Sequence, residues 1–407
     1  MNNYPKWEDF LSADIKDWHD TNIGGIFLHR QEKNRPELPL LSVTGGGGVV
    51  DRDTLERRDT SNADKSKYLK VSTGDIVYNT MRMWQGVSGS AHKDGLVSPA
   101  YTVLEPKESI IPLFAKYLVK EERLVQVFHR NSQGLVDDTL NLKFANLSPI
   151  KVKIPPLPEQ KKIASILTSV DEVIENTQKQ INKLQDLKKA TMNELLTKGI
   201  GHTEFKDSEL GQIPKSWEVK TIDDVIKFTG GAQPPRSSFI FAPKEGYVRL
   251  LQIRDYKSDR FATYIPEKLS RRNCNEDDVL IGRYGPPIFQ ILRGKAGSYN
   301  VALIKSEPRN GSLLKGYMYH FLTRSDLFHL IDSLSQRTSG QTGIDLDALK
   351  SFGFPFPPIE EQHRILEILD HMDAANKRLL NKLSQTQSLK KSLMKDLLTG
   401  KVRVTVN

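Results

Sequence analysis

Cysteine is almost missing from this 407-residue sequence, in which Cys274 is the only one. A single thiol forms neither an internal disulfide nor a cysteine-based zinc cluster, as is typical of proteins from a reducing compartment. Apolar runs are short as well, and none approaches the 18 residues that indicate a membrane-spanning helix. The first residues lack the basic-then-apolar layout of a secretory signal. We therefore expect a soluble, cytoplasmic protein without a membrane partner.

Recognisable catalytic motifs are also lacking. The run Gly45–Gly48 is not followed by Lys and Ser or Thr, so it is not a nucleotide-binding P-loop, and we interpret it as a mobile loop. Tyr284-Gly285-Pro286-Pro287 lacks the amide or acid with which adenine methyltransferases hold a flipped base. The nine histidines form no pair with the spacing of metal ligands. The sequence therefore predicts no catalytic residue, no metal ligand and no cofactor bound by this chain.

Positive charge is in excess. Lys and Arg number 59 against 50 Asp and Glu, which gives a formal net charge of +9. Such a balance favours a polyanionic partner without proving one, and a basic surface that only keeps the protein soluble remains the alternative. Charge alone does not decide between the two.

An internal repeat is the strongest signal in the chain. The stretch that begins Pro155-Pro156-Leu157-Pro158-Glu159-Gln160 occurs again as Pro357-Pro358-Ile359-Glu360-Glu361-Gln362. The two copies align without a gap as far as Thr197 and Thr399, and 16 of the 43 aligned positions are identical. Unrelated helices would match at roughly 3 such positions, so half of the chain has been duplicated.

Each copy has the apolar spacing of a long helix. Proline is tolerated at a helix start and an acid there complements the helix dipole, so the first helix should begin near Pro158 or Glu159. About 40 residues would form a rod of roughly 60 Å, too long for one small domain to bury its apolar stripe. Because the copies carry matching stripes, we expect them to pack against each other as an antiparallel pair with pseudo-twofold symmetry. The first stripe includes Val173 and Leu187, and the second includes Leu389.

The segments before each helix share a plan. The segments Val71–Asn79 and Glu276–Ile281 each indicate a turn that leads into a buried strand. One predicted helix follows each of them, over 111–127 and 313–330 respectively. The alternation of Leu147, Ile150, Val152 and Ile154 predicts a strand that leads into the prolines, and Phe352, Phe354 and Phe356 repeat it. We predict an α+β fold of two globular α/β domains joined by the helix pair. The predicted division is residues 1–154, helical region 155–200, connector and second domain 201–356, helical region 357–400 and tail 401–407.

Polar, basic and aromatic stretches recur at equivalent places in the two domains. One follows the buried strand and the other precedes the last strand. Arg and Gln or Asn read guanine and adenine edges through paired hydrogen bonds, whereas Ser, Thr and backbone amides hold phosphates. Any one of these loops alone is more often a solvated turn, so recurrence is the argument. The candidate DNA-binding residues are Arg82, Trp84, Gln85, Arg130, Asn131, Gln133, Arg283, Tyr284, Gln290, Arg337, Thr338, Ser339 and Gln341.

The sequence resembles a specificity subunit of a type I restriction-modification system. The resemblance lies in both Pro-Pro-x-x-Glu-Gln motifs, the Leu-Leu-Thr ends at 195–197 and 397–399, the segment 199–217 and the terminal 400–404. These parts cover about a third of the chain. Within the globular domains only the layout resembles the family's target recognition domains.

The resemblance implies a DNA-recognition subunit without catalysis of its own. Each domain would bind one half of a bipartite, asymmetric site in double-stranded DNA, and the helices would set the spacing between the halves. Two methyltransferase subunits and the restriction subunits would assemble on this chain. S-adenosylmethionine, ATP and magnesium would belong to those partners. The target sequence does not follow from the resemblance.

A second hypothesis comes from a different class of protein. The chain could be a coiled-coil scaffold whose globular domains bind proteins, with incidental basic charge. The two hypotheses differ in the salt dependence of DNA binding, because even a few phosphate contacts impose a steep negative slope.

Overall fold

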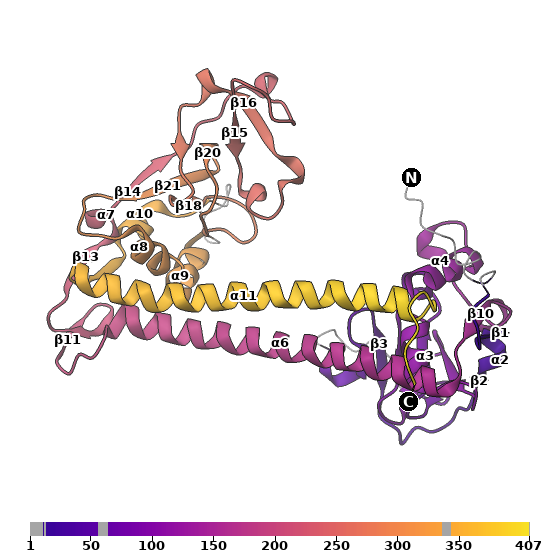
Figure 1. The fold of residues 1–407 in the computed structure, drawn as a ribbon. Coiled ribbons are helices and arrows are strands. Elements are labelled where there is room, and N and C mark those ends of the chain that lie inside the picture. The colour runs from indigo at the N-terminus through magenta and orange to yellow at the C-terminus, as the bar shows by residue number, and fades with distance from the viewer. Residues whose placement is uncertain (1–10, 12–13, 56–63, 336–342, 407) are drawn as a thin grey trace. The chain divides into compact units, whose positions relative to one another are not determined.

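The computed structural model describes residues 11, 14–55, 64–335 and 343–406 (Figure 1). The chain forms two compact units. Unit 1 combines Met1–Lys179 with Leu380–Asn407, and unit 2 comprises Gln180–Leu379. Two long helices, α6 (Leu157–Lys198) and α11 (Ile359–Leu397), contribute to both units. Every helix among the described residues is too short or too polar to span a lipid bilayer.

The two units contain the same four-stranded antiparallel sheet. In unit 1 the strand order is β2-β9-β6-β7, and in unit 2 it is β14-β21-β18-β19. The strands of unit 1 are β2 (Phe27–Arg30), β9 (Tyr101–Pro106), β6 (Ile76–Asn79) and β7 (Ser88–Ser90). Those of unit 2 are β14 (Ile226–Gly230), β21 (Leu303–Pro308), β18 (Val279–Gly282) and β19 (Gln290–Leu292). The predicted α+β class and internal repeat are confirmed.

Smaller elements complete each unit. Unit 1 also has β1 (His19–Asn22), α2 (Ile23–Ile26), β3 (Leu41–Thr44), β4 (Gly48–Asp51), η1 (Arg52–Thr54), β5 (Leu69–Val71), η2 (Met83–Gln85), β8 (Gly95–Val97), η3 (Asp137–Thr139), α5 (Phe144–Leu147) and β10 (Lys151–Ile154). Unit 2 also has β11 (Phe205–Ser208), β12 (Gly211–Pro214), β13 (Glu218–Thr221), α7 (Ile222–Val225), η4 (Arg236–Ser238), β15 (Tyr247–Leu251), η5 (Ile253–Tyr256), η6 (Asp259–Phe261), β16 (Thr263–Pro266), η7 (Glu267–Leu269), β17 (Asn273–Cys274), β20 (Gly297–Tyr299), α10 (Leu346–Ser351) and β22 (Gly353–Phe356).

The single helix predicted over 111–127 is wrong, because two helices occupy this segment. They are α3 (Pro112–Leu118) and α4 (Glu122–Asn131). The carboxylate of Glu121 accepts hydrogen bonds from the amides of Arg123 and Leu124, so this residue caps a new helix instead of continuing the old one. The segment 313–330 is divided in the same way, into α8 (Lys315–Leu322) and α9 (Ser325–Ser335).

The glycine run, which we expected to be a mobile loop, forms the turn of a β-hairpin. Gly45, Gly46 and Gly47 connect β3 to β4, and Gly48 is the first residue of β4 and pairs with Thr44. Gly48 has a φ of 66°, a left-handed conformation that glycine adopts at little cost. The glycine run therefore allows the chain to reverse direction between β3 and β4.

The helices begin in one unit and end in the other, and they run antiparallel. In unit 1, Ile163 near the start of α6 and Leu397 at the end of α11 belong to one buried core. In unit 2, Ile365 near the start of α11 and Leu195 near the end of α6 share the corresponding core. Each globular core is thus completed by the beginning of one long helix and the end of the other.

Part of the predicted apolar stripe is not buried. The exposed fractions of Val173, Leu187 and Leu389 are 41%, 57% and 52%. A stripe with a repeat near 3.5 residues drifts around a straight helix of 3.6 residues per turn, so some positions turn away from the partner helix. The described parts of both helices therefore expose some apolar side chains between their ends.

The acid of each Pro-Pro-x-x-Glu-Gln motif lies at a junction between domain and helices. Glu159 accepts a hydrogen bond from the indole nitrogen of Trp18 at 3.1 Å and pairs with Arg403 at 2.7 Å. Glu361 accepts from the indole nitrogen of Trp217 at 2.8 Å. Both acids are buried. A hydrogen-bonded carboxylate thus ties the first turn of each long helix to a tryptophan of its own unit.

The glutamine of each motif bridges three backbone groups. Gln160 and Gln362 are fully buried, and each joins the helix start to the loop before α3 or α8. Each side chain accepts one hydrogen bond from an amide and donates two to carbonyl groups. Gln160 accepts from the amide of Ile111 at 2.9 Å and donates to the carbonyls of Ser109 at 3.0 Å and Pro155 at 2.9 Å. Gln362 accepts from the amide of Leu314 at 2.9 Å and donates to the carbonyls of Ser312 at 2.9 Å and Pro357 at 3.0 Å.

Candidate nucleic-acid interface

Two polar loops predicted to bind DNA lie against each other in unit 1. Arg82, Trp84 and Gln85 occupy the turn between β6 and β7. The ring of Trp84 packs on His129 of α4, with ring centroids 5.4 Å apart. Arg82 lies 3.5 Å from Asp138, which follows α4 along the chain. The structure thus brings segments about 45 residues apart into one surface.

The remaining candidates of unit 1 lie at the end of α4 and just beyond it. The side chains of Arg130, Asn131 and Gln133 are exposed. The amide nitrogen of Asn131 donates to the carbonyl of Val127 at 2.9 Å, which closes the last turn of the helix. Gln133 pairs through its backbone with Asn141. Asn131 therefore has a structural role, whereas Arg130 and Gln133 extend the polar surface around Arg82.

Acidic side chains on this surface were missed by the sequence reasoning. Asp137 lies 3.9 Å from His129, and Asp138 is 88% exposed beside Arg82. The ion pair leaves Arg82 43% exposed. Because an exposed ion pair contributes at most about 1 kcal/mol, a ligand can take over the guanidinium at little cost. Aspartate can also accept a hydrogen bond from cytosine.

In unit 2 the corresponding turn lies between β18 and β19. Arg283 and Tyr284 come directly after β18, and the guanidinium of Arg283 lies 5.4 Å from the centre of the Tyr284 ring. The carbonyl of Arg283 accepts a hydrogen bond from the amide of Ile344, and Tyr284 forms a β-bridge with Gly343. This turn therefore packs on the segment that begins at Gly343.

The other candidates of unit 2 are placed less completely. Gln290 begins strand β19 instead of lying in the turn, and its side chain donates to the carbonyl of Pro287 at 2.9 Å. Arg337, Thr338, Ser339 and Gln341 lie outside the described residues. Assignment of all these side chains to DNA binding stays a prediction.

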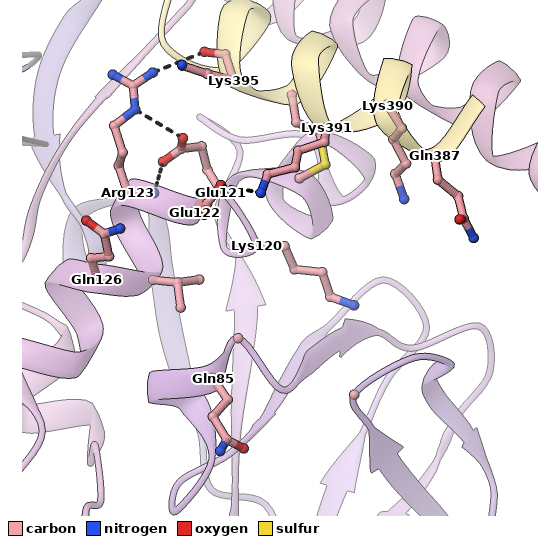
Figure 2. Close-up of a pocket in the computed structure, with 14 residues that line it drawn as sticks. Gln85, Lys120, Glu121, Glu122, Arg123, Gln126, Gln387, Lys390, Lys391 and Lys395 are labelled. Atoms are coloured by element: carbon pink, nitrogen blue, oxygen red, sulfur yellow. Dashed lines mark hydrogen bonds and ion pairs between the residues drawn. The ribbon is translucent and has the colours of Figure 1, made fainter. Parts of the chain in front are cut away.

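Gln85 also lies at the edge of a pocket in unit 1. Figure 2 shows its side chain across the pocket from the lysines of α11. Lys390 and Lys391 are about 300 positions away in the sequence. No local motif signals that they would meet the loop of Gln85.

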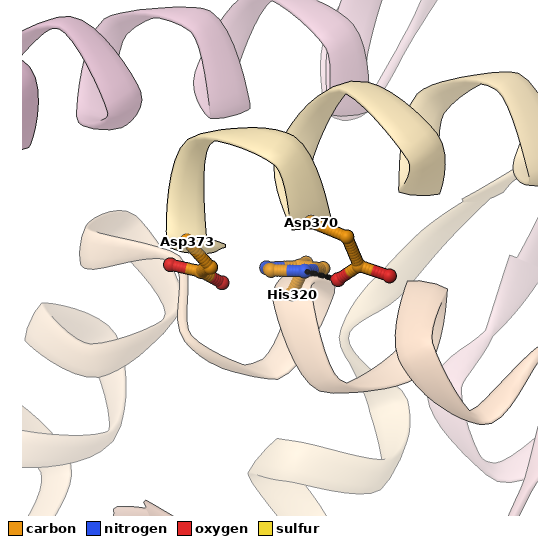
Figure 3. A group of neighbouring side chains, drawn as sticks. All are labelled: His320, Asp370 and Asp373. Atoms are coloured by element: carbon orange, nitrogen blue, oxygen red, sulfur yellow. Dashed lines mark ion pairs between the residues drawn. The ribbon is translucent and has the colours of Figure 1, made fainter. Parts of the chain in front are cut away.

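A possible metal-ligating group was not predicted from the sequence. His320 of α8 lies between Asp370 and Asp373 of α11, and the three potential ligand atoms are within 4.8 Å of one another (Figure 3). The imidazole is fully buried, and neither ring nitrogen hydrogen-bonds to a described residue. Burial lowers the pKa of His320 to about 4, and the positive charge of Lys188 acts in the same direction. The imidazole is therefore neutral at pH 7.

The repeat explains this group without a metal. Unit 1 holds Tyr117 at the place of His320, and the tyrosine hydroxyl donates to Asp171 at 2.8 Å. Asp171 pairs with Lys390 at 2.5 Å, just as Asp373 pairs with Lys188 in unit 2. Because a lysine already neutralises the carboxylate in both units, the group is a second junction between domain and helices. At this position unit 1 has a tyrosine that hydrogen-bonds to Asp171, whereas unit 2 has the neutral imidazole of His320.

Comparisons with known proteins agree with this duplicated architecture. The family model of the type I restriction modification DNA specificity domain matches the chain twice, over residues 15–186 and 214–386. A putative type I restriction enzyme MjaX specificity subunit from Methanocaldococcus jannaschii is 28% identical over 420 residues, covering 98% of this chain and 94% of the relative. The EcoKI specificity subunit from Escherichia coli K12 is 22% identical over 363 residues, covering 82% and 76%.

Solved structures share the fold. The type I restriction-modification S subunit from M. genitalium superposes with a TM-score of 0.56 at 15% identity, covering 95% of this chain and 97% of that one. A chain from a structure describing assembly and conformational transition of the type I R-M system gives a TM-score of 0.59, also at 15% identity, covering 96% and 100%. Because the family model matches most of the chain, the chain belongs to the type I restriction-modification DNA specificity family, and it is a non-catalytic specificity subunit that recognises DNA sequence with two domains.

Proposed function

We propose that each unit recognises one half of a bipartite and asymmetric site in double-stranded DNA. The observation that carries this proposal is the contrast within the repeat. The sheets, the helix starts and the motif contacts recur in both units, whereas the loops after β6 and β18 carry different side chains. Two units with the same fold but different loop side chains fit two half-sites of different sequence.

In this proposal the loops read bases and the helices set the unread spacer. Arg82 and Gln85 in unit 1, with Arg283 and Tyr284 in unit 2, are the foremost described candidates, and Arg337 and Gln341 complete the set. Arginine reads guanine through two parallel hydrogen bonds, and glutamine does the same for adenine. The helical regions 155–200 and 357–400 would separate domains 1–154 and 201–356, with a tail at 401–407.

We further infer that two methyltransferase subunits dock on the helices and that restriction subunits join them. Leu187 and Leu389 support this stoichiometry. They occupy equivalent positions of the repeat, and their side chains are 57% and 52% exposed. Two equivalent apolar positions suit two copies of one partner. S-adenosylmethionine, ATP and magnesium would be bound by these partners, in the cytoplasm where chromosomal DNA is accessible.

Replacing Arg82 by alanine tests the assignment of loops to half-sites. The variant and the wild-type chain, each assembled with the methyltransferase subunits, would methylate a DNA library randomised at one half-site at a time. We expect discrimination to fall by about 1–3 kcal/mol at one or two positions of a single half-site. Replacing the exposed Lys162 of α6 by alanine is the matched control. A uniform loss over all sequences would assign Arg82 to a phosphate contact.

The scaffold hypothesis gives a different outcome in the same assay. A chain whose globular domains bind only proteins would support no sequence preference in either half-site. Membership of the specificity family already argues against it.

A further inference from the structure

The pocket beside Gln85 is strongly basic. It has a volume of about 570 Å³ and lies in unit 1 between the loop of Gln85 and Gly86, the start of α4 and the last turns of α11 (Figure 2). Five cationic side chains line it against two carboxylates, those of Glu121 and Glu122. The cationic residues are Lys120, Arg123, Lys390, Lys391 and Lys395.

Both carboxylates are already engaged. Glu122 pairs with Lys391 at 3.1 Å. Glu121 caps α4 and lies 3.4 Å from Arg123. Outside the lining, the single charge of Asp171 pairs with Lys390. Among the described residues, none of these three carboxylates pairs with Lys120.

Lys120 is the least compensated of these cations. Among the described residues its ammonium group makes neither a hydrogen bond nor an ion pair within 4.0 Å. Burial lowers the pKa of Lys120, and the neighbouring Lys390 lowers it further. In Figure 2 its side chain extends into the open space between Gln85 and the lysines of α11. An ammonium ion that is partly desolvated and close to other cations is stabilised by an incoming anion.

The repeat indicates that Lys120 is not needed for folding. In unit 2 the equivalent position, at the same distance before the next helix, is Thr323. The threonine hydroxyl is satisfied by the carbonyl of His320 at 2.8 Å. The same junction therefore forms with a small neutral side chain, and the lysine is a feature of unit 1 alone.

We propose that this pocket binds a backbone phosphate of the DNA whose bases are read by the neighbouring loop, with Lys120 and Lys390 as its main contacts. This inference rests on the proposed function of the Gln85 loop. That loop forms one wall of the pocket, so a phosphate held there would fix the register of the duplex next to the reading side chains. Lysine supplies a compact charge with three donors, which suits phosphate oxygens.

The test replaces Lys120 by threonine, the residue that unit 2 carries at this place. Affinities of the chain assembled with its methyltransferase subunits would be measured between 50 and 200 mM salt, on target and non-target duplexes. Losing one phosphate contact should reduce the slope of log affinity against log salt concentration by about 0.9. Between 50 and 200 mM salt, the loss of affinity should therefore be about 3.5-fold smaller for the variant than for the wild-type chain. The change should be equal on both duplexes, with target preference intact. Lys162→Ala is the matched control.

Three results would overturn the inference. An unchanged slope with intact target preference would exclude the phosphate contact and leave the proposed function standing. Weaker assembly with the methyltransferase at an unchanged slope would assign the pocket to an acidic partner segment. Protection of Lys120 from amine labelling by inorganic phosphate, again with an unchanged slope, would indicate a site for free phosphate. If the wild-type assembly itself lacked target preference, the proposed function would fail instead.

Discussion

Replacing Gln362 by alanine should destabilise unit 2 by about 3–5 kcal/mol, although the substitution touches neither the apolar core nor the predicted DNA surface. The side chain is fully buried and forms three hydrogen bonds to backbone groups. Its loss leaves the amide of Leu314 and the carbonyls of Ser312 and Pro357 without these partners. A buried polar group left unsatisfied costs about 1–3 kcal/mol, and carbonyls that reach water cost less.

The variant Gln362→Glu separates hydrogen bonding from volume. Glutamate fills nearly the same space, but a carboxylate would present oxygen to two carbonyl oxygens that now lie 2.9 and 3.0 Å from the amide nitrogen. We expect a loss of stability at pH 7 at least as large as for alanine. Stability should recover in part as the pH falls, because the protonated acid donates one hydrogen bond.

The equivalent residue of unit 1 provides the matched control. Hydrogen exchange should become faster by roughly 100-fold or more around Leu314 in Gln362→Ala, since each 1.4 kcal/mol is a factor of ten. Exchange around Ile111 should stay as in the wild type. Gln160→Ala should give the reverse pattern. A loss below about 1 kcal/mol, or faster exchange in both units from one substitution, would refute the assigned role of the motif.

Three further predictions concern the helices and their junctions. His320→Tyr, which installs the residue of unit 1, should reduce the loss of stability between pH 7 and pH 5 by up to roughly 2 kcal/mol in urea titrations. Lengthening α6 by one turn, about 5.4 Å, should widen the unread DNA spacer by one or two base pairs at 3.4 Å each, measured by methylation mapping. Leu187→Glu or Leu389→Glu should each remove one methyltransferase subunit, and the double variant both, as measured by light scattering.

The sign of the pH effect follows from the two states of His320. The pKa is about 4 in the folded chain and near 6.5 when unfolded. The unfolded chain therefore takes up a proton in this window, and stability falls as the pH drops through it. An identical pH dependence in wild type and His320→Tyr would contradict the burial argument. An unchanged spacer would refute the helices as a ruler, and unchanged stoichiometry would exclude the leucines as docking positions.

The two long helices and their starting points could be predicted from the sequence, because short-range patterns determine them. Helical periodicity and the Pro-Pro-x-x-Glu-Gln motif predicted the start of α6 within two residues of Leu157. The structural role of the motif could not be predicted, because its hydrogen bonds are long-range. Glu159 bonds to Trp18, 141 positions away, and Glu361 bonds to Trp217, 144 positions away. The break before α4 was missed for another reason. Glutamate is a good helix former and is not among the residues favoured at an N-cap, so nothing in the sequence indicated that Glu121 begins a new helix.

The candidate site shows the same limit more strongly. Recurrence of polar loops singled out Arg82 and Gln85, but not that Trp84 would pack on His129 or that Asp138 would pair with Arg82. The basic pocket could not be anticipated at all, since its lysines come from α3–α4 and α11. Long-range contacts of this kind depend on how elements pack, which no local spacing records. Which bases the loops recognise depends in addition on their contacts with DNA.

Methylation mapping of cells that express this subunit with its methyltransferase partner tests the central claim most directly. It reports both half-sites and the spacer between them in one experiment. We predict a single bipartite target whose two halves differ in sequence, separated by a fixed unread spacer. A palindromic target, or a continuous one without a spacer, would contradict recognition by two different domains held apart by two helices.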